Sequence, residues 1–244
     1  MFDAYVLHTI CYRETSLIIK FFTKEQGITN LIANGAKRKK SQFAGILQPF
    51  VPLLIYWKDN SKDLATLYKA EGLSAPHKLS GVFLFISLYI NELLLKLLSH
   101  HDPAPELFLC YKQFLENLSN LSKNNNALTK LELAKNLRFI EKKILQAIGY
   151  ELQLDRESRN GQAIDINAKY YFDFDNGLNL FKLSTSQKPC WLPKPIIITG
   201  KSLLALHNND YIDLIEMQEA KIFMRRILAN FLGDRVLATR KLFV

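Results

Sequence analysis

The chain has 244 residues, enough for one large domain or two smaller ones, each with its own hydrophobic core. Its 48% hydrophobic and 23% charged residues are typical of a folded globular protein and exclude a disordered chain. A net charge of +9 and a pI near 9.3 favour an anionic partner, and more than half of the excess charge lies in the first 80 residues, where 11 Lys and Arg stand against 6 Asp and Glu.

Cys11, Cys110 and Cys190 are too far apart for a CxxC metal knuckle or a disulfide framework, and they fit a reducing cytoplasm. The N-terminus lacks a basic region followed by an apolar core, so we expect no secretory signal. The apolar run 82–98 is interrupted by polar residues and is shorter than the ~20 residues that a bilayer requires. It predicts a buried helix and no membrane contact.

Five short runs near the N-terminus have strand composition and are separated by turn residues. They span residues 4–10, 15–23, 28–33, 51–57 and 64–70. Five such strands predict a small closed barrel of the OB-fold type, which binds oligonucleotides on one sheet face and its flanking loops. We expect about one in four of the aromatic residues here to lie on a binding face, because the core claims most large apolar side chains. These aromatics are Tyr5, Tyr12, Phe21, Phe22, Phe43, Phe50, Tyr56, Trp57 and Tyr68.

Between the third and fourth runs lies the segment NGAKRKKSQFAGILQPF, residues 34–50, with four consecutive cations. They are Lys37, Arg38, Lys39 and Lys40. Gly35 lets the backbone turn sharply before them, and the following Ser41, Gln42 and Phe43 offer hydroxyl, amide and aromatic contacts. Such a cluster attracts polyanions without reading sequence, although a charge run is also typical of a solvated loop. We predict that these cations bind phosphates, with Arg13 and Lys20 as weaker candidates.

Residues 72–80, with Pro76, form the predicted boundary between a barrel domain, 1–80, and a second domain, 81–244. Beyond it the periodicity becomes helical. The run 82–99 is apolar nearly all round, which is typical of a helix at the centre of a bundle. Asp102-Pro103 offers a cap and first turn for a second helix, over about residues 105–118. A third helix over about residues 127–148 ends at Gly149.

The third predicted helix has an apolar stripe and a basic face. Leu133, Leu137, Ile140, Ile144 and Ile148 recur at helical spacing and predict its buried side. Lys135, Arg138 and Lys142 recur on another face, with Lys143 beside them. Spacing alone is more typical of a solvated helix face than of a binding surface.

An insertion at about residues 150–198 is predicted to hold a hairpin, in which runs 169–175 and 178–183 flank the two-residue turn Asn176-Gly177. Thr199 can cap a short helix through Leu206, and a last helix over residues 216–232 ends at Gly233. Lys221, Arg225 and Arg226 give this helix a second basic surface. The sequence leaves open whether this surface contacts DNA. The predicted fold class is α+β: an N-terminal five-stranded OB-fold barrel followed by a mainly α-helical domain with a small β-hairpin insertion.

Several segments in a fixed order resemble the bacterial DNA repair protein family RecO. They are Glu14-Thr15-Ser16, the turn at residues 22–27, Asn34-Gly35-Ala36-Lys37, Leu47-Gln48-Pro49-Phe50, residues 149–155, and residues 220–243. The resemblance covers most of the chain and is weakest over residues 156–195. Many members carry a four-cysteine zinc module after the Leu-Asp at 154–155, where this chain has Arg156-Glu157-Ser158-Arg159-Asn160-Gly161. We therefore predict a zinc-less variant with no metal and no cofactor.

The resemblance implies a cytoplasmic, nucleoid-associated recombination mediator that is not an enzyme. Such a protein binds single- and double-stranded DNA, anneals complementary strands and, with RecR, helps load RecA onto DNA covered by single-strand-binding protein. The family also binds the acidic, phenylalanine-ended tail of single-strand-binding protein in its helical domain. A slot for that tail requires an apolar floor edged by cations. We place it on the third helix, at Arg138, Phe139, Lys142, Lys143 and Leu145.

Catalytic motifs are missing from the sequence: it has no P-loop, GxGxxG, HExxH or GxSxG. His100-His101-Asp102 and the pair Asp173 and Asp175 are better explained as surface or turn residues than as metal or acid-base sites. Two alternatives stay open. A nucleic-acid-modifying enzyme would show metal-dependent activity, and an RNA-binding or ribosome-associated OB-fold protein would prefer RNA over matched single-stranded DNA.

Overall fold

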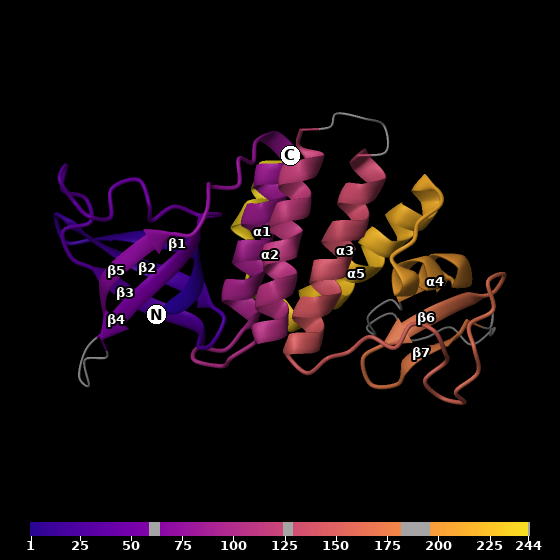
Figure 1. Ribbon diagram of the computed structural model, residues 1–244. Coiled ribbons are helices and arrows are strands. Elements are labelled where there is room, and N and C mark those ends of the chain that lie inside the picture. Colours follow the sequence, from indigo (N-terminus) through magenta and orange to yellow (C-terminus); the bar gives the residue numbers. More distant parts are fainter. Residues whose placement is uncertain (59–63, 124–128, 182–195, 244) are drawn as a thin grey trace. The chain divides into compact units, whose positions relative to one another are not determined.

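A computed structural model describes residues 1–58, 64–123, 129–181 and 196–243 (Figure 1). The chain divides into two compact units, the first comprising residues 1–125 and 235–244 and the second residues 126–234. Within the described ranges, no helix is long and apolar enough to cross a membrane.

Five strands close into a barrel in the order β1-β2-β3-β5-β4. They are β1 (Phe2–Tyr12), β2 (Ser16–Thr23), β3 (Gly27–Ala33), β4 (Pro52–Lys58) and β5 (Thr66–Gly72). β1 pairs antiparallel with both β2 and β4, and β3 meets β5 in parallel, with Ile32 opposite Thr66. The predicted five-stranded OB-fold barrel is confirmed, with strand ends close to those expected from the alternation of side chains.

The first two strands are buried on both faces where they lie against helices. Four consecutive residues of β1, Ala4 to Leu7, are buried, although a strand with one wet face would expose every second one. Ala4, Val6 and Phe21 belong to the barrel core. Tyr5 and Phe22 face the other way, and their rings meet Phe108 at centroid distances of 5.6 and 5.4 Å. A second layer therefore covers the outer face of the barrel here.

That layer consists of two helices, α1 (Gly81–Leu97) and α2 (Pro105–Leu121), which lie side by side next to the barrel (Figure 1). Asn91 of α1 donates from Nδ2 to the Leu7 carbonyl at 3.2 Å and accepts a 2.6 Å hydrogen bond from the Tyr111 hydroxyl of α2. The loop between the helices also touches the barrel, because the His101 amide donates to the Ile28 carbonyl at 3.1 Å. The barrel and this helical hairpin thus share one packed interior.

The C-terminal residues complete the first unit by closing on α1. The short 3-10 helix η1 (Ala238–Phe243) starts where the Glu92 carboxylate accepts hydrogen bonds from the Ala238 and Thr239 amides, at 2.8 and 2.9 Å. The Thr239 hydroxyl adds a third, at 2.7 Å. Burial raises the pKa of the Glu92 carboxyl, but these hydrogen bonds from Thr239 and Ala238 outweigh it and leave the pKa below its usual value.

The second unit packs three helices with a small sheet. Its helices are α3 (Thr129–Ala147), α4 (Gly200–Asn208) and α5 (Leu214–Leu232), and its sheet has the order β7-β6-β8. The strands are β6 (Lys169–Asp173), β7 (Gly177–Leu180) and β8 (Ile196–Thr199). Phe172 of β6 packs edge-on against Phe223 of α5, with centroids 5.7 Å apart. Thr199 caps α4, as the sequence predicts, by accepting from the Ser202 amide.

Two local predictions are wrong, and one strand was not predicted. The hairpin has a three-residue loop, residues 174–176, because the strand pairing starts at Asp173 and Gly177 and only Gly177 has a positive φ. Asp173 accepts from the Asp175 and Asn176 amides, so its carboxylate shapes this turn. The third strand, β8, was not foreseen, since its pairing partner β6 lies far away in sequence. Helix α2 begins at Pro105 after Ala104, not at an Asp102 cap.

The boundary predicted between residues 80 and 81 falls in the connection from β5 to α1 and stays a prediction about domains. The two compact units of the structure are divided at a different place, because α1 and α2 belong to the same unit as the barrel. This association follows from the buried outer faces of β1 and β2.

Gly27 lies where the α1–α2 loop touches β3. Its φ is +61°, and a Cβ there would lie 2.0 Å from the carbonyl oxygen of Asp102, which cannot move without shifting backbone. We expect Gly27→Ala to lower the free energy of unfolding by about 3 kcal/mol or more, at the upper part of the range for single substitutions. Chemical denaturation, followed through far-UV circular dichroism, measures the loss.

Gly45→Ala is the matched control. Gly45 also has a positive φ, +75°, but no atom lies within 4 Å of the position that a Cβ would take there. The substitution should cost only about 1 kcal/mol, the strain of a left-handed alanine. Equal losses in the two variants would contradict tight packing between β3 and the helical loop.

Candidate nucleic-acid interface

The basic segment 34–50 connects β3 to β4 as a series of hydrogen-bonded turns. The Arg38 amide donates to the Gly35 carbonyl, Ser41 to Arg38, and Ala44 to Ser41, at 3.0–3.1 Å. Gly35 has a φ of +68°, as expected for the sharp turn before the cations. The Lys37 amide donates to the Thr15 carbonyl at 2.9 Å and ties the segment to the β1–β2 turn.

Apolar side chains anchor the same segment to the barrel. Phe43 and Leu47 are buried and belong to the barrel core. The expectation that Phe43 contacts a ligand is therefore wrong, because this ring fills the interior. Ser41 instead accepts from the Phe43 amide at 3.2 Å, and Gln42 donates from Nε2 to the Tyr68 carbonyl of β5 at 3.0 Å. The cations are thus carried on a segment fixed at both sides.

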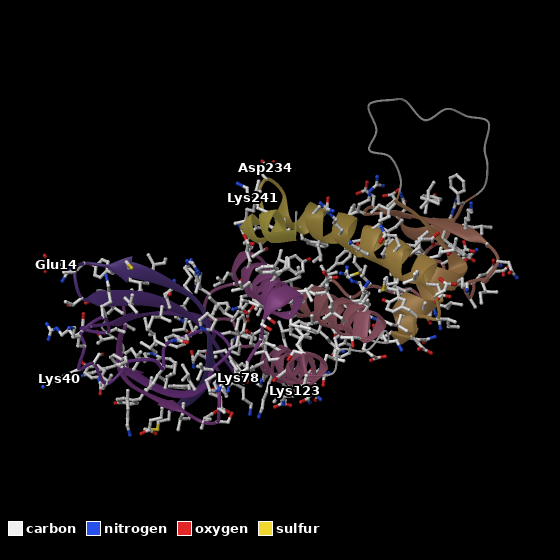
Figure 2. The ribbon with its side chains drawn as sticks, turned by 90° about the horizontal axis from the view of Figure 1, so that it is seen from above. Glu14, Lys40, Lys78, Lys123, Asp234 and Lys241 are labelled. Atoms are coloured by element: carbon white, nitrogen blue, oxygen red, sulfur yellow. The ribbon has the colours of Figure 1, made fainter. Side chains whose placement is uncertain are left out.

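All four predicted cations of the segment are exposed. They form no ion pair within the described residues. Arg13, also exposed, lies over the Tyr12 ring at 5.1 Å in the β1–β2 turn that bonds to Lys37. Figure 2 shows Lys40 and Glu14 at the end of the barrel away from α1 and α2. The structure therefore brings Arg13 and the four cations together at one end, with Glu14 as the acidic neighbour.

Lys20 does not join this cluster. It lies in the middle of β2, opposite His8 of β1 and Asn30 of β3, and is only partly exposed. Its side of the strand is the one that Phe22 presents to α2. Lys20 is therefore separate from the cations at the barrel end.

The cations predicted on α3 have partners inside the second unit. Arg138 is buried and forms an ion pair with Glu141 at 2.6 Å. The Lys142 ammonium donates to the carbonyls of Leu206 and His207 at the end of α4. Leu145 is fully buried. Lys143 stays closer to the surface, with its ammonium 5.9 Å from the Phe139 ring centre and bonded to Gln146.

Comparison with known proteins identifies the family. The model for the N-terminal part of recombination protein O matches residues 1–76, and the model for its C-terminal part matches residues 81–221. The chain belongs to the RecO family. The DNA repair protein RecO of Methylococcus capsulatus is 40% identical over 245 residues, covering 98% of this chain and 91% of that protein. Those of Nitrosospira multiformis and Haemophilus influenzae are 36% and 33% identical, over 98% of this chain and 92% and 93% of theirs.

Membership of the RecO family supports a role in DNA repair and explains why the fold follows the expected order of barrel and helices. The segment 156–161 is a turn on the edge of the small sheet in this member. The Ser158 hydroxyl accepts from the Leu178 amide at 2.9 Å, and the Glu157 amide donates to the Gln162 carbonyl at 2.8 Å. Among the described residues, no group of three or more His, Cys, Asp or Glu could hold a metal ion; Cys190 lies outside them.

Two exposed tyrosines next to the cationic segment were not singled out from the sequence. Of the nine aromatics named in the barrel region, Tyr56 and Tyr68 are the most exposed, at 48% and 49%. Nothing in the local sequence around either tyrosine indicates that the two rings lie together. Their proximity follows from the pairing of β4 with β5. The basic surface predicted on α5, formed by Lys221, Arg225 and Arg226, is exposed in the second unit.

Lys142 provides a test of the α3 environment. Burial, assisted by the charge of Lys143, lowers the pKa of the Lys142 ammonium from 10.5 to about 8. Between these values the unfolded chain binds a proton that the folded chain does not, so the free energy of unfolding should rise with pH in this window. We expect Lys142→Met to remove this rise, as measured by chemical denaturation at a series of pH values.

Lys130→Met is the control, because Lys130 is an exposed cation on the same helix. It should keep the pH dependence of the native chain. Parallel curves for the native chain and Lys142→Met would show that the Lys142 ammonium is not desolvated.

Proposed function

We propose that this chain is a non-enzymatic recombination mediator that binds single- and double-stranded DNA and anneals complementary strands. With RecR, it helps load RecA onto DNA covered by single-strand-binding protein. The observation that carries the proposal is the cluster of four exposed cations on an anchored segment of an OB-fold barrel in a RecO-family chain. Annealing requires two polyanions to approach each other, and cations that neutralise phosphates without reading bases lower that repulsion.

Binding through Lys37, Arg38, Lys39 and Lys40 has two physical supports. No carboxylate of the segment 34–50 competes for the cations, since it contains no Asp or Glu. The apolar anchors, Phe43 and Leu47, reduce the chain entropy that would be lost on binding a strand. Arg13 extends the cluster through the β1–β2 turn, and Lys20 is a separate, single contact on β2.

The first experiment is fluorescence strand annealing, with and without single-strand-binding protein, for the native chain and the variant in which all four cations of the segment become Ala. We expect a sharp fall in annealing. Affinity for single-stranded DNA should depend less on salt, with a log–log slope smaller by up to about 3, because each lost phosphate contact contributes about 0.7.

A charge-matched control removes four exposed cations elsewhere: Lys78, Lys112, Lys123 and Lys130. Figure 2 shows two of them, Lys78 and Lys123, away from the barrel end that carries Lys40. Equal losses in both variants would mean that net charge alone attracts DNA. Unchanged annealing in the segment variant would place the DNA site elsewhere, and no annealing by the native chain would contradict the mediator function.

The second part of the proposal is that α3 binds the acidic, phenylalanine-ended tail of single-strand-binding protein. Phe139 and Lys143 are the contact pair, since both are partly exposed and close to each other. Lys142 flanks them, whereas Arg138 and Leu145 lie beneath as buried support. An aromatic ring beside an ammonium suits a ligand that ends in a phenyl group and a carboxylate.

Lys143→Glu should weaken binding of a tail peptide about tenfold or more, because an attractive charge becomes a repulsive one next to a carboxylate ligand. Lys130→Glu makes the same charge change on the same helix and should have little effect. Fluorescence anisotropy with a labelled peptide compares them. If the two reversals weaken binding equally, the tail does not use this part of α3.

A further inference from the structure

The outer face of the β4–β5 ribbon carries a pair of tyrosines. Tyr56 of β4 and Tyr68 of β5 are 48% and 49% exposed, and their ring centres are 6.4 Å apart with the planes inclined by 53°. Both phenyl faces belong to the first unit, as does the cationic segment. Two large half-exposed rings in contact form a small aromatic surface on an otherwise charged ribbon that includes Lys58, Lys69 and Glu71.

A β-bulge puts the second ring in this position. Tyr56 pairs with Lys69 and Trp57 pairs with Leu67, so Tyr68 is the extra residue of β5. Leu67 and Ala70 on either side still point into the barrel core. Because the bulge breaks the alternation, Tyr68 and Lys69 are both exposed although they are neighbours. Bulges re-aim side chains in this way, often next to functional sites.

The bulge also connects the tyrosines to the cations. An extra residue lies outside the strand ladder, and the Tyr68 carbonyl accepts the 3.0 Å hydrogen bond from Gln42 Nε2. Gln42 follows Lys40 by two residues in the same anchored segment. The hydrogen bond therefore ties the backbone of Tyr68 to the segment that carries the predicted phosphate contacts, and it uses a side chain that those contacts do not require.

We propose that Tyr56 and Tyr68 form a stacking platform for unpaired bases of a single strand whose phosphates lie on the cationic segment. Every base has a flat π-face, so aromatic stacking adds affinity without sequence preference. The bases of a duplex already stack on each other, and the platform thus favours single strands over duplexes. The inference rests on the proposed DNA binding for its phosphate contacts. Gln42 is a positioning residue that holds the Tyr68 backbone.

The test compares three DNA ligands of equal length: a single strand, an abasic single strand with the same number of phosphates, and a duplex. The double substitution Tyr56→Ala, Tyr68→Ala should weaken binding of the base-bearing single strand roughly tenfold or more. Binding of the abasic strand and the duplex should stay the same. The salt dependence should not change, because no phosphate contact is lost.

Variants that keep or displace the rings sharpen the result. Tyr56→Phe with Tyr68→Phe retains both π-faces and should bind every ligand as the native chain does. Gln42→Ala should reduce only the base-dependent part of the affinity. In a Tyr68→Trp variant, the base-bearing strand should quench the indole fluorescence at this position more strongly than the abasic strand.

The outcomes separate this platform from the proposed function. Equal weakening of base-bearing and abasic strands by the double alanine variant, or no weakening at all, overturns the platform. Far-UV circular dichroism of that variant excludes unfolding as the cause of any loss. The variant lacking the four cations should lose affinity for all three ligands, so a failure of phosphate binding is visible independently of the tyrosines.

Discussion

The outer faces of β1 and β2 pack against α2 through aromatic rings, and this layer decides which surfaces of the barrel remain open. Tyr5 meets Tyr111 edge-on with centroids 5.2 Å apart, and Phe22 meets Phe108 at 5.4 Å. Such rings bury large areas, and pairs in inclined geometry add further stabilisation. Because the helical hairpin covers this side, the cationic end and the outer face of the β4–β5 ribbon are the parts of the barrel discussed here that stay exposed.

A buried polar pair fixes the alignment of that layer. The Tyr111 hydroxyl donates to Asn91, whose amide in turn donates to the Leu7 carbonyl. Burial raises the pKa of the Tyr111 hydroxyl, so the proton that this network requires stays in place. An aromatic interface alone tolerates sliding, whereas a buried hydrogen bond is lost at a cost when its partners move. The same register positions the loop after α1, whose Asp102 carbonyl leaves no room for a side chain at Gly27.

The positions of the barrel strands and of the helices could be predicted from local sequence patterns. The order of the segments that resemble the RecO family supported the same arrangement of a barrel followed by helices. The features that local pattern missed depend on distant partners. The apolar run Ala4 to Leu7 and the paired phenylalanines Phe21 and Phe22 contain a signal for burial on two faces. Taken one by one, the aromatic residues among them indicate only a barrel core or a binding face. Strand β8 needs β6, and the Tyr68 bulge is visible only in the pairing with β4.

The two groups of predicted site cations show why the exposure of a cation is easier to predict from sequence in one place than in another. On α3, Arg138 and Lys142 recur at helical spacing. Arg138 forms an ion pair with Glu141, and Lys142 donates hydrogen bonds to the carbonyl end of α4. The α4 partners are more than 60 residues away in sequence. The segment 34–50 has no acid of its own, and its apolar residues hold it on the barrel. Cations without an acidic neighbour in their own segment therefore stay exposed. The lack of acidic residues can be read from the sequence, whereas the anchoring through Phe43 and Leu47 is visible only in the barrel core.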